Sequence, residues 1–127
     1  MGMTMAEKVL ARNSGLAKVR PGQYVTAKID RIMVGDRLAE MYGAFKEIGI
    51  DKVWDPSRVI ALTDHLVPAR DTESAEMDVL KRKFVHDFGL TYWYDVGRGG
   101  VSHQIMPEKG HALPGTLVVG MDSHTTS

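Results

Sequence analysis

The sequence of 127 residues contains no cysteine. Disulfides, thiolate nucleophiles and zinc sites built from cysteine are therefore excluded for these residues. An iron–sulfur cluster is held in proteins by thiolates, so this chain offers no cysteine ligand for one. The absence narrows the available chemistry to that of carboxylates, imidazoles, hydroxyls and amines.

An excess of one charge sign is also missing, since 16 lysines and arginines balance 16 aspartates and glutamates. This neutrality gives no electrostatic case for a nucleic acid or an acidic membrane as partner. The longest apolar runs, 59–62 and 117–121, are far shorter than the roughly 20 residues of a membrane-spanning helix. Glu7 and Lys8 stand where a secretory peptide would be apolar, so we expect a cytoplasmic protein.

What is present is ordinary globular composition, with 43% hydrophobic and 25% charged residues, and we expect one α/β domain over residues 1–127. Helices are expected after Thr4, after a capping Asp36, and over 71–88. Apolar or β-branched runs predict four strands, at 24–34, 59–62, 91–96 and 116–121, the second and fourth of them buried. Alternating strands and helices predict three layers, a mostly parallel sheet with flanking helices.

The clearest expected helix is 71–88, where Met77, Leu80, Phe84 and Phe88 recur at helical spacing. Acidic residues in its first half precede basic residues in its second half, as the helix dipole favours. These four apolar side chains are expected to face the core.

Polar residues that can carry chemistry gather after the expected strands and the glycine loop at 97–100. They are Asp64 and His65 after one strand, His103 after the loop, and Asp122, Ser123 and His124 after another strand. Carboxyl ends of parallel strands meet at one sheet edge, where ligands of open α/β sheets bind. We therefore expect one crevice holding an acid/base or metal site, in which neighbouring carboxylates raise histidine pKa values.

Simpler interpretations exist for each group. A single histidine after a strand is more often a hydrogen-bonded loop residue, and Asp64 or Asp122 alone could cap a turn. His86 on the expected helix and His111 in a loop are interpreted as residues without a chemical role, His86 on the solvated surface. The glycines at 97–100 lack the spacing of a dinucleotide-binding fingerprint.

Three motifs occur in order: DH-x-x-P-A at 64–69, G-x-x-HQ-x-x-PE-x-G at 100–110, and DSHT at 122–125. With the stretch AFKEIGIDKVWDPSRV at 44–59, they resemble the opening part of the aconitase superfamily, closest to the large subunits of 3-isopropylmalate dehydratase and homoaconitase. The resemblance covers nearly the whole chain. It implies a lyase that removes and re-adds water on a hydroxy di- or tricarboxylic acid, as in leucine biosynthesis, at a 4Fe-4S cluster with one open iron.

The resemblance also implies roles for single residues. His65 resembles the acid that protonates the departing hydroxyl, and Asp64 its orienting partner. His103 and Asp122 resemble a second imidazole–carboxylate pair beside the cluster.

Two further residues of the DSHT motif have implied roles. His124 resembles a ligand-facing histidine near the cluster-bound water. Ser123 resembles a donor to a substrate carboxylate.

By the same resemblance, the cysteines that ligate the cluster lie well beyond the DSHT motif, and other catalytic groups come from later domains or a separate small subunit. We therefore expect an amino-terminal portion of a larger large subunit, without a cluster or turnover of its own and able to self-associate through an exposed interface. Gly35 stands where the family usually places a glutamine or histidine that contacts substrate, so the identity of the hydroxy acid stays open.

Two alternatives remain open on the residues themselves. Carboxylates and imidazoles also suit zinc or manganese, so the clusters could serve a divalent-metal hydrolase. The chain could equally be a non-catalytic assembly module, in which case losing His65 or His124 would leave partner binding unchanged.

Overall fold

The computed structural model describes residues 2–126 and contains four helices and four strands in those residues. The elements in chain order are α1 (Met5–Ser14), β1 (Arg31–Val34), α2 (Leu38–Ile48), β2 (Val59–Leu62), α3 (Thr72–Asp87), β3 (Tyr92–Tyr94), α4 (Ser102–Glu108) and β4 (Val118–Gly120). The strands form one sheet in the order β3-β2-β1-β4, and all three pairings are parallel. Their carboxyl ends therefore meet at one edge.

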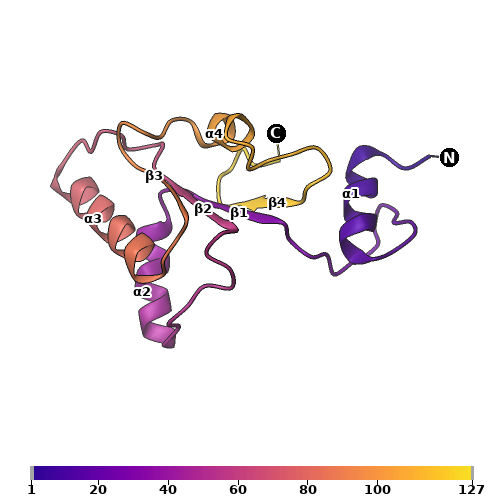
Figure 1. Ribbon diagram of the computed structural model, residues 1–127, viewed down its shortest axis with the longest axis horizontal. Helices are drawn as coiled ribbons and strands as arrows, with labels where there is room; N and C mark the ends of the chain where they lie inside the picture. The colour runs from indigo at the N-terminus through magenta and orange to yellow at the C-terminus, as the bar shows by residue number, and fades with distance from the viewer. Residues whose placement is uncertain (1, 127) are drawn as a thin grey trace.

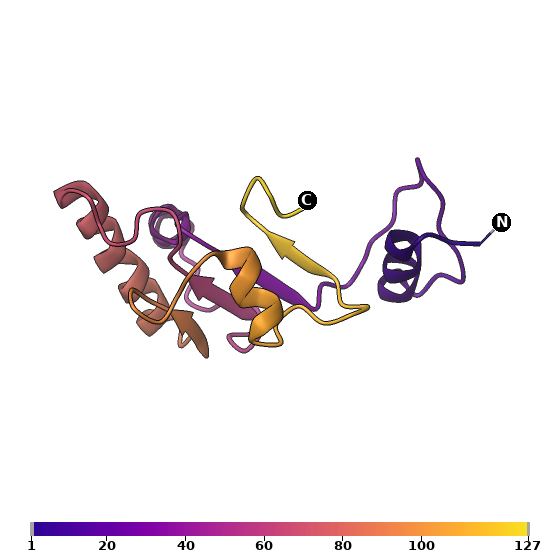
Figure 2. The ribbon, with the colours of Figure 1, turned by 90° about the horizontal axis from the view of Figure 1, so that it is seen from above.

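The sheet is covered on both faces because its central strands alternate side chains between two cores. Val34, Val59 and Ala61 pack with α2 and α3 in one cluster. Ile60 and Leu62 point the other way and pack against α4. Figures 1 and 2 show α2 and α3 on one side of the sheet and α4 on the other. The expected three-layer α/β architecture is confirmed.

The helix α1 lies apart from the other helices, at the opposite end of the molecule from α2 and α3 (Figures 1 and 2). It begins at a capping box in which the Thr4 hydroxyl accepts from the Glu7 N–H, as the sequence predicts. Arg12 Nη1 donates to the Gly115 carbonyl at 3.2 Å and so ties α1 to the loop before β4.

Several expectations are wrong in detail. The strand expected over 24–34 is limited to β1, and Tyr24 is fully exposed. Asp36 does not cap α2, whose N-cap residue is Arg37, and the Arg37 side chain makes no capping hydrogen bond to the helix backbone. The strand β4 is half-buried instead of buried, because β1 is its only partner among the described strands.

Two helices also differ from expectation. The helix α4 is absent from the prediction, since it has only seven residues and contains Pro107. The helix α3 is confirmed and begins at the capping Asp71, but its buried face differs: Leu80 is 40% exposed, whereas Asp78 and Lys81 are buried with Phe84. None of the helices within residues 2–126 has the length and apolar character required to cross a bilayer.

Candidate active site

The predicted polar residues lie at the carboxyl edge of the sheet, as the parallel topology requires. Asp64 and His65 follow β2, while Asp122, Ser123 and His124 follow β4. The strand β1 lies between β2 and β4, so residues that follow β1 stand between the two groups. The remaining predicted residue, His103, is on α4.

The His65 ring is held by two carboxylates. Its Nδ1 lies 2.5 Å from Asp64 Oδ1 and 2.9 Å from Asp36 Oδ2. Carboxylates accept hydrogen bonds, so Nδ1 carries a proton, and Nε2 is the ring nitrogen left for a ligand. The hydrogen bond to Asp64 and its charge raise the pKa of His65; burial opposes this effect, and Asp36 adds to it. His65 is therefore suited to hold and donate a proton near neutral pH.

Asp36 is a site residue that the sequence interpretation assigned to helix capping. Its Oδ2 also accepts from the His65 backbone N–H at 3.1 Å, and its Oδ1 accepts from Lys81 Nζ at 2.8 Å. Lys81 Nζ donates to Asp78 Oδ1 as well, at 3.0 Å. The side chains of Lys81 and Asp78 are only 2% and 5% exposed, so a buried ion pair stands behind the His65 site.

A signal for this ion pair exists in the helical spacing. Asp78, Lys81, Phe84 and Phe88 follow one another at intervals of three, three and four residues. These positions share one helix face, so the polar pair continues the stripe that the two phenylalanines begin. An acid and a base placed on an apolar stripe indicate a buried pair.

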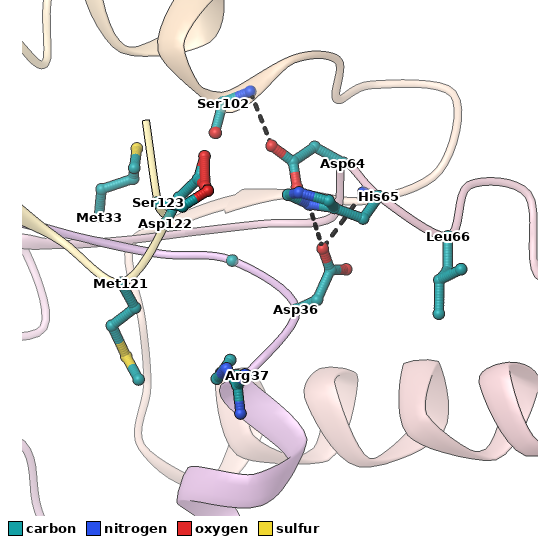
Figure 3. A pocket seen from close by; sticks show the side chains of 11 residues that line it. Met33, Asp36, Arg37, Asp64, His65, Leu66, Ser102, Met121, Asp122 and Ser123 are labelled. Carbon is teal, nitrogen blue, oxygen red and sulfur yellow. Dashed lines mark hydrogen bonds and ion pairs between the residues drawn. The ribbon is translucent and has the colours of Figure 1, made fainter. Parts of the chain in front are cut away.

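A cavity of about 350 Å³ lies in front of these groups. Figure 3 shows Asp64, Asp36 and His65 on one side of it, with Asp122 and Ser123 opposite. Its lining residues are Met33, Gly35, Asp36, Arg37, Asp64, His65, Leu66, Ser102, Met121, Asp122 and Ser123.

Ser102 is a second lining residue that the sequence interpretation missed. Its backbone N–H donates to Asp64 Oδ2 at 3.0 Å and so fixes the carboxylate that orients His65. Its side chain is buried, and its hydroxyl has no hydrogen-bond partner among the described residues. A buried hydroxyl without a partner is costly to the fold, so Ser102 is a candidate for contact with a ligand.

The second predicted pair also forms. His103 Nε2 lies 2.7 Å from Asp122 Oδ1, and this hydrogen bond holds the pKa of Asp122 well below its usual range. Asp122 Oδ2 accepts from the His124 backbone N–H and from the Ser123 hydroxyl. The rings of His103 and His124 are 6.4 Å apart.

His103 and His124 line a neighbouring cavity of about 510 Å³, and Met33 lines both cavities. The expected single crevice is thus two adjoining hollows at one sheet edge. His86 is exposed at 89% of its side chain, as expected for a solvated position. His111 is buried instead, and its Nε2 lies 2.6 Å from the Tyr94 hydroxyl, while burial lowers its pKa.

The only group of three acidic or histidine side chains with metal-compatible spacing in residues 2–126 is Asp36, Asp64 and His65, whose donor atoms lie within 4.8 Å of one another. Asp36 already faces a cation, the Lys81 ammonium at 2.8 Å. Asp64 is occupied by His65 and by the Ser102 N–H. This hydrogen bonding satisfies the carboxylates without an ion.

Comparison with known proteins identifies the family of this chain. A family model described as the aconitase family (aconitate hydratase) matches residues 7–127. The chain belongs to the aconitase family. Its relatives include the 3-isopropylmalate dehydratase large subunit of Moorella thermoacetica, 45% identical over 98% of this chain and 30% of that subunit. The corresponding large subunit 1 of Methanopyrus kandleri is 48% identical with the same coverage, and a probable large subunit of Methanothermobacter thermautotrophicus is 47% identical.

This aconitase-family chain spans about 30% of the length of the curated relatives it matches. The family implies a 4Fe-4S cluster in the full enzyme, and the donor set here can be tested against it. Soft thiolates hold such clusters, whereas the site offers hard carboxylates and imidazoles and the sequence has no cysteine. The residues of this chain do not fit as the ligands of the cluster.

Proposed function

We propose that this chain supplies the proton-donating part of a hydro-lyase that dehydrates a hydroxy di- or tricarboxylic acid. The relatives are named 3-isopropylmalate dehydratase large subunits, so 3-isopropylmalate is the first substrate to test. The observation that carries the proposal is the His65 ring, held at Nδ1 by two carboxylates on the wall of a cavity.

His65 acts as general acid in this proposal. A departing hydroxyl leaves far more easily as water, so a proton donor must stand beside it. The carboxylates of Asp64 and Asp36 stabilise the imidazolium and hold the ring, and Nε2–H gives the proton to the leaving oxygen. A single positioned acid contributes typically 10²–10⁴-fold to a rate, which sets the size of the effect expected from removing it.

The opposite wall binds and orients the substrate. There the Ser123 hydroxyl, which donates to Asp122 at 3.2 Å, can turn to donate to a substrate carboxylate instead. The Ser102 hydroxyl, which has no partner among the described residues, offers a second donor beside Asp64. Asp122 fixes His103 through the 2.7 Å contact, and His124 stands next to it with its ring toward the second hollow. A carboxylate-bearing substrate would thus meet the Ser123 hydroxyl opposite His65 and the Ser102 hydroxyl next to Asp64.

Other polypeptide segments complete the site. The cluster, the base that abstracts the proton and the groups that bind the second carboxylate are proposed to come from further large-subunit domains and a small subunit. The alternatives are a divalent-metal hydrolase and an assembly module. The spacing of Asp36, Asp64 and His65 is compatible with a metal, but the contact between Lys81 and Asp36 disfavours a second cation there.

A hybrid enzyme tests the proposal. This chain replaces the matching 30% of the Moorella thermoacetica large subunit, which then supplies the remaining domains and is assembled anaerobically with its small subunit. Dehydration is followed by the absorbance of 2-isopropylmaleate. Activity of the hybrid supports the proposal, whereas a fully assembled hybrid with iron and no dehydration of isopropylmalate or citrate contradicts it. Stoichiometric zinc or manganese in the purified chain would favour the hydrolase.

A further inference from the structure

Lys81 carries a charge at a buried position, where removal from water is unfavourable. It is 2% exposed, on the face of α3 that packs toward the sheet, and its ammonium contacts two carboxylates, Asp36 Oδ1 at 2.8 Å and Asp78 Oδ1 at 3.0 Å. Burying such a pair often stabilises a fold no better than apolar side chains of the same volume. Stability alone is thus a weak reason for a lysine at this position.

The contact with Asp36 connects Lys81 to His65. One Asp36 oxygen accepts from the Lys81 ammonium, and the other lies 2.9 Å from His65 Nδ1. Figure 3 shows the Asp36 carboxylate directed toward His65. One carboxylate is therefore shared between a buried cation and an imidazole on the cavity wall.

Sharing Asp36 matters because His65 faces two carboxylates. Each of them stabilises the imidazolium, and two unopposed negative charges would bind its proton too firmly for release near neutral pH. A general acid works best when its pKa lies near the working pH. The Lys81 charge cancels much of one carboxylate and moderates this effect.

We propose that Lys81 is a positioning residue that sets the proton affinity of His65 through the shared carboxylate of Asp36. The pKa values agree with this chain of contacts. Burial is the largest effect and works to raise the pKa of Asp36, but the hydrogen bond and charge of Lys81, together with hydrogen bonding from Asp64 and the His65 N–H, outweigh it. The pKa of Asp36 is therefore lowered, and Asp36 stays ionised toward His65. The inference uses the proposed function only in taking the His65 proton as the one to be transferred.

The charged groups around His65 come from every element packed against it. They are Asp36 and Arg37 after β1, Asp64 after β2, Asp78 and Lys81 on α3, and Asp122 after β4. Arg37 Nη1 is engaged by Glu40 at 2.9 Å, and Asp122 by His103. Lys81 is the cation among them that contacts a carboxylate bonded to His65.

The test is an NMR titration of the His65 ring in the 127-residue chain, which requires no catalytic turnover. Lys81→Met should raise the His65 pKa by roughly half to one unit, since a charge within a few ångströms shifts a pKa by about that much or more. Arg82→Met on the same helix is the matched control, because Arg82 pairs with Asp95 instead, and it should leave the His65 pKa unchanged. A fall toward the ordinary histidine value, or no change, overturns the proposal, since mere loosening of the site would give that result.

Two further variants guard against loss of folding and isolate the route. Lys81→Met leaves Asp78 buried without its cation, so Asp78→Asn/Lys81→Met removes both charges together and should still raise the His65 pKa. In an Asp36→Asn background, Lys81→Met should shift His65 by less than half as much, because the shared carboxylate is gone. An equal shift with and without Asp36 contradicts the route through Asp36. The proposed function fails separately, through an inactive hybrid enzyme.

Discussion

Ser102 carries a buried hydroxyl that faces the site cavity and lacks a partner among residues 2–126. An unsatisfied buried group costs stability, and replacing it with a methyl group removes that cost. Because the contact to Asp64 comes from the backbone N–H, it survives a change of side chain. A substitution of the Ser102 side chain can therefore test ligand binding without lowering the stability of the fold.

Ser102→Ala should leave the free energy of unfolding unchanged or raise it by up to about 1 kcal/mol, while weakening substrate binding in the hybrid enzyme. Ser74→Ala is the control, since Ser74 is also buried but its hydroxyl bonds to Asp71 at 2.6 Å. That variant should lose about 1 kcal/mol. Urea unfolding and the KM of the hybrid measure both effects, and a destabilised Ser102→Ala chain with unchanged KM contradicts the role.

Asp122 makes the fold sensitive to acid. Hydrogen bonding to His103 lowers its pKa in the folded state, so its stabilising contribution is present above the unfolded value near 3.8 and is lost as the pH falls below it. Asp122→Asn should therefore flatten the fall in urea midpoint between pH 5 and pH 2.5. An equally steep fall in both proteins would show that Asp122 does not contribute.

Local sequence could not pair Asp36 with Lys81. Asp36 stands where a helix cap is expected, and Lys81 follows acidic residues as the helix dipole favours. Their pairing joins positions 45 residues apart, so only the packing of α3 against the end of β1 brings them together. Asp64 and His65 were predictable at the site because a buried strand ends directly before them.

At the scale of elements, the loop between β3 and α4 sets the position of Ser102 and His103. A Cβ added at Gly99 would lie 3.0 Å from the Tyr94 carbonyl oxygen and 3.2 Å from that of Thr63. Both are backbone atoms that cannot move aside cheaply. Position 99 thus needs a glycine for close approach, not for a left-handed conformation.

Gly99→Ala should destabilise the chain by about 1–3 kcal/mol, as overpacking typically does, and should shift the NMR signals of His103. Gly100→Ala is the control, because its Cβ would make only ordinary contact with Ile105 at 3.7 Å. It should change stability by less than about 0.5 kcal/mol. Equal effects of the two substitutions would contradict the close-approach argument.

The elements differ in how far the sequence predicts them, for physical reasons. The strand β2 matches its apolar run because both of its faces are covered. The helix α3 matches its predicted range because it is long and well capped. The segment before β1 alternates like a strand, yet it runs beyond the sheet without a strand partner. α4 offers too few residues for a period, and its helical form depends on packing Met106 against the sheet.

At the scale of the whole molecule, the parallel sheet brings residues from three strand ends and one helix to a single edge. Two adjoining hollows result, one lined by His65 and one by His103 and His124. The chain spans about 30% of its relatives, so the proposed reaction belongs to a larger assembly. In the proposed function, this part contributes the proton that His65 donates.

The most direct test compares two histidines in the hybrid enzyme. His65→Asn should lower kcat for isopropylmalate dehydration by about 10²–10⁴-fold, the usual contribution of a general acid. His86→Asn, on the exposed face of α3, should leave kcat within a factor of two of the parent hybrid. Both hybrids must carry the same iron content. A His65→Asn hybrid that keeps the parent kcat would contradict the assignment of His65 as the acid.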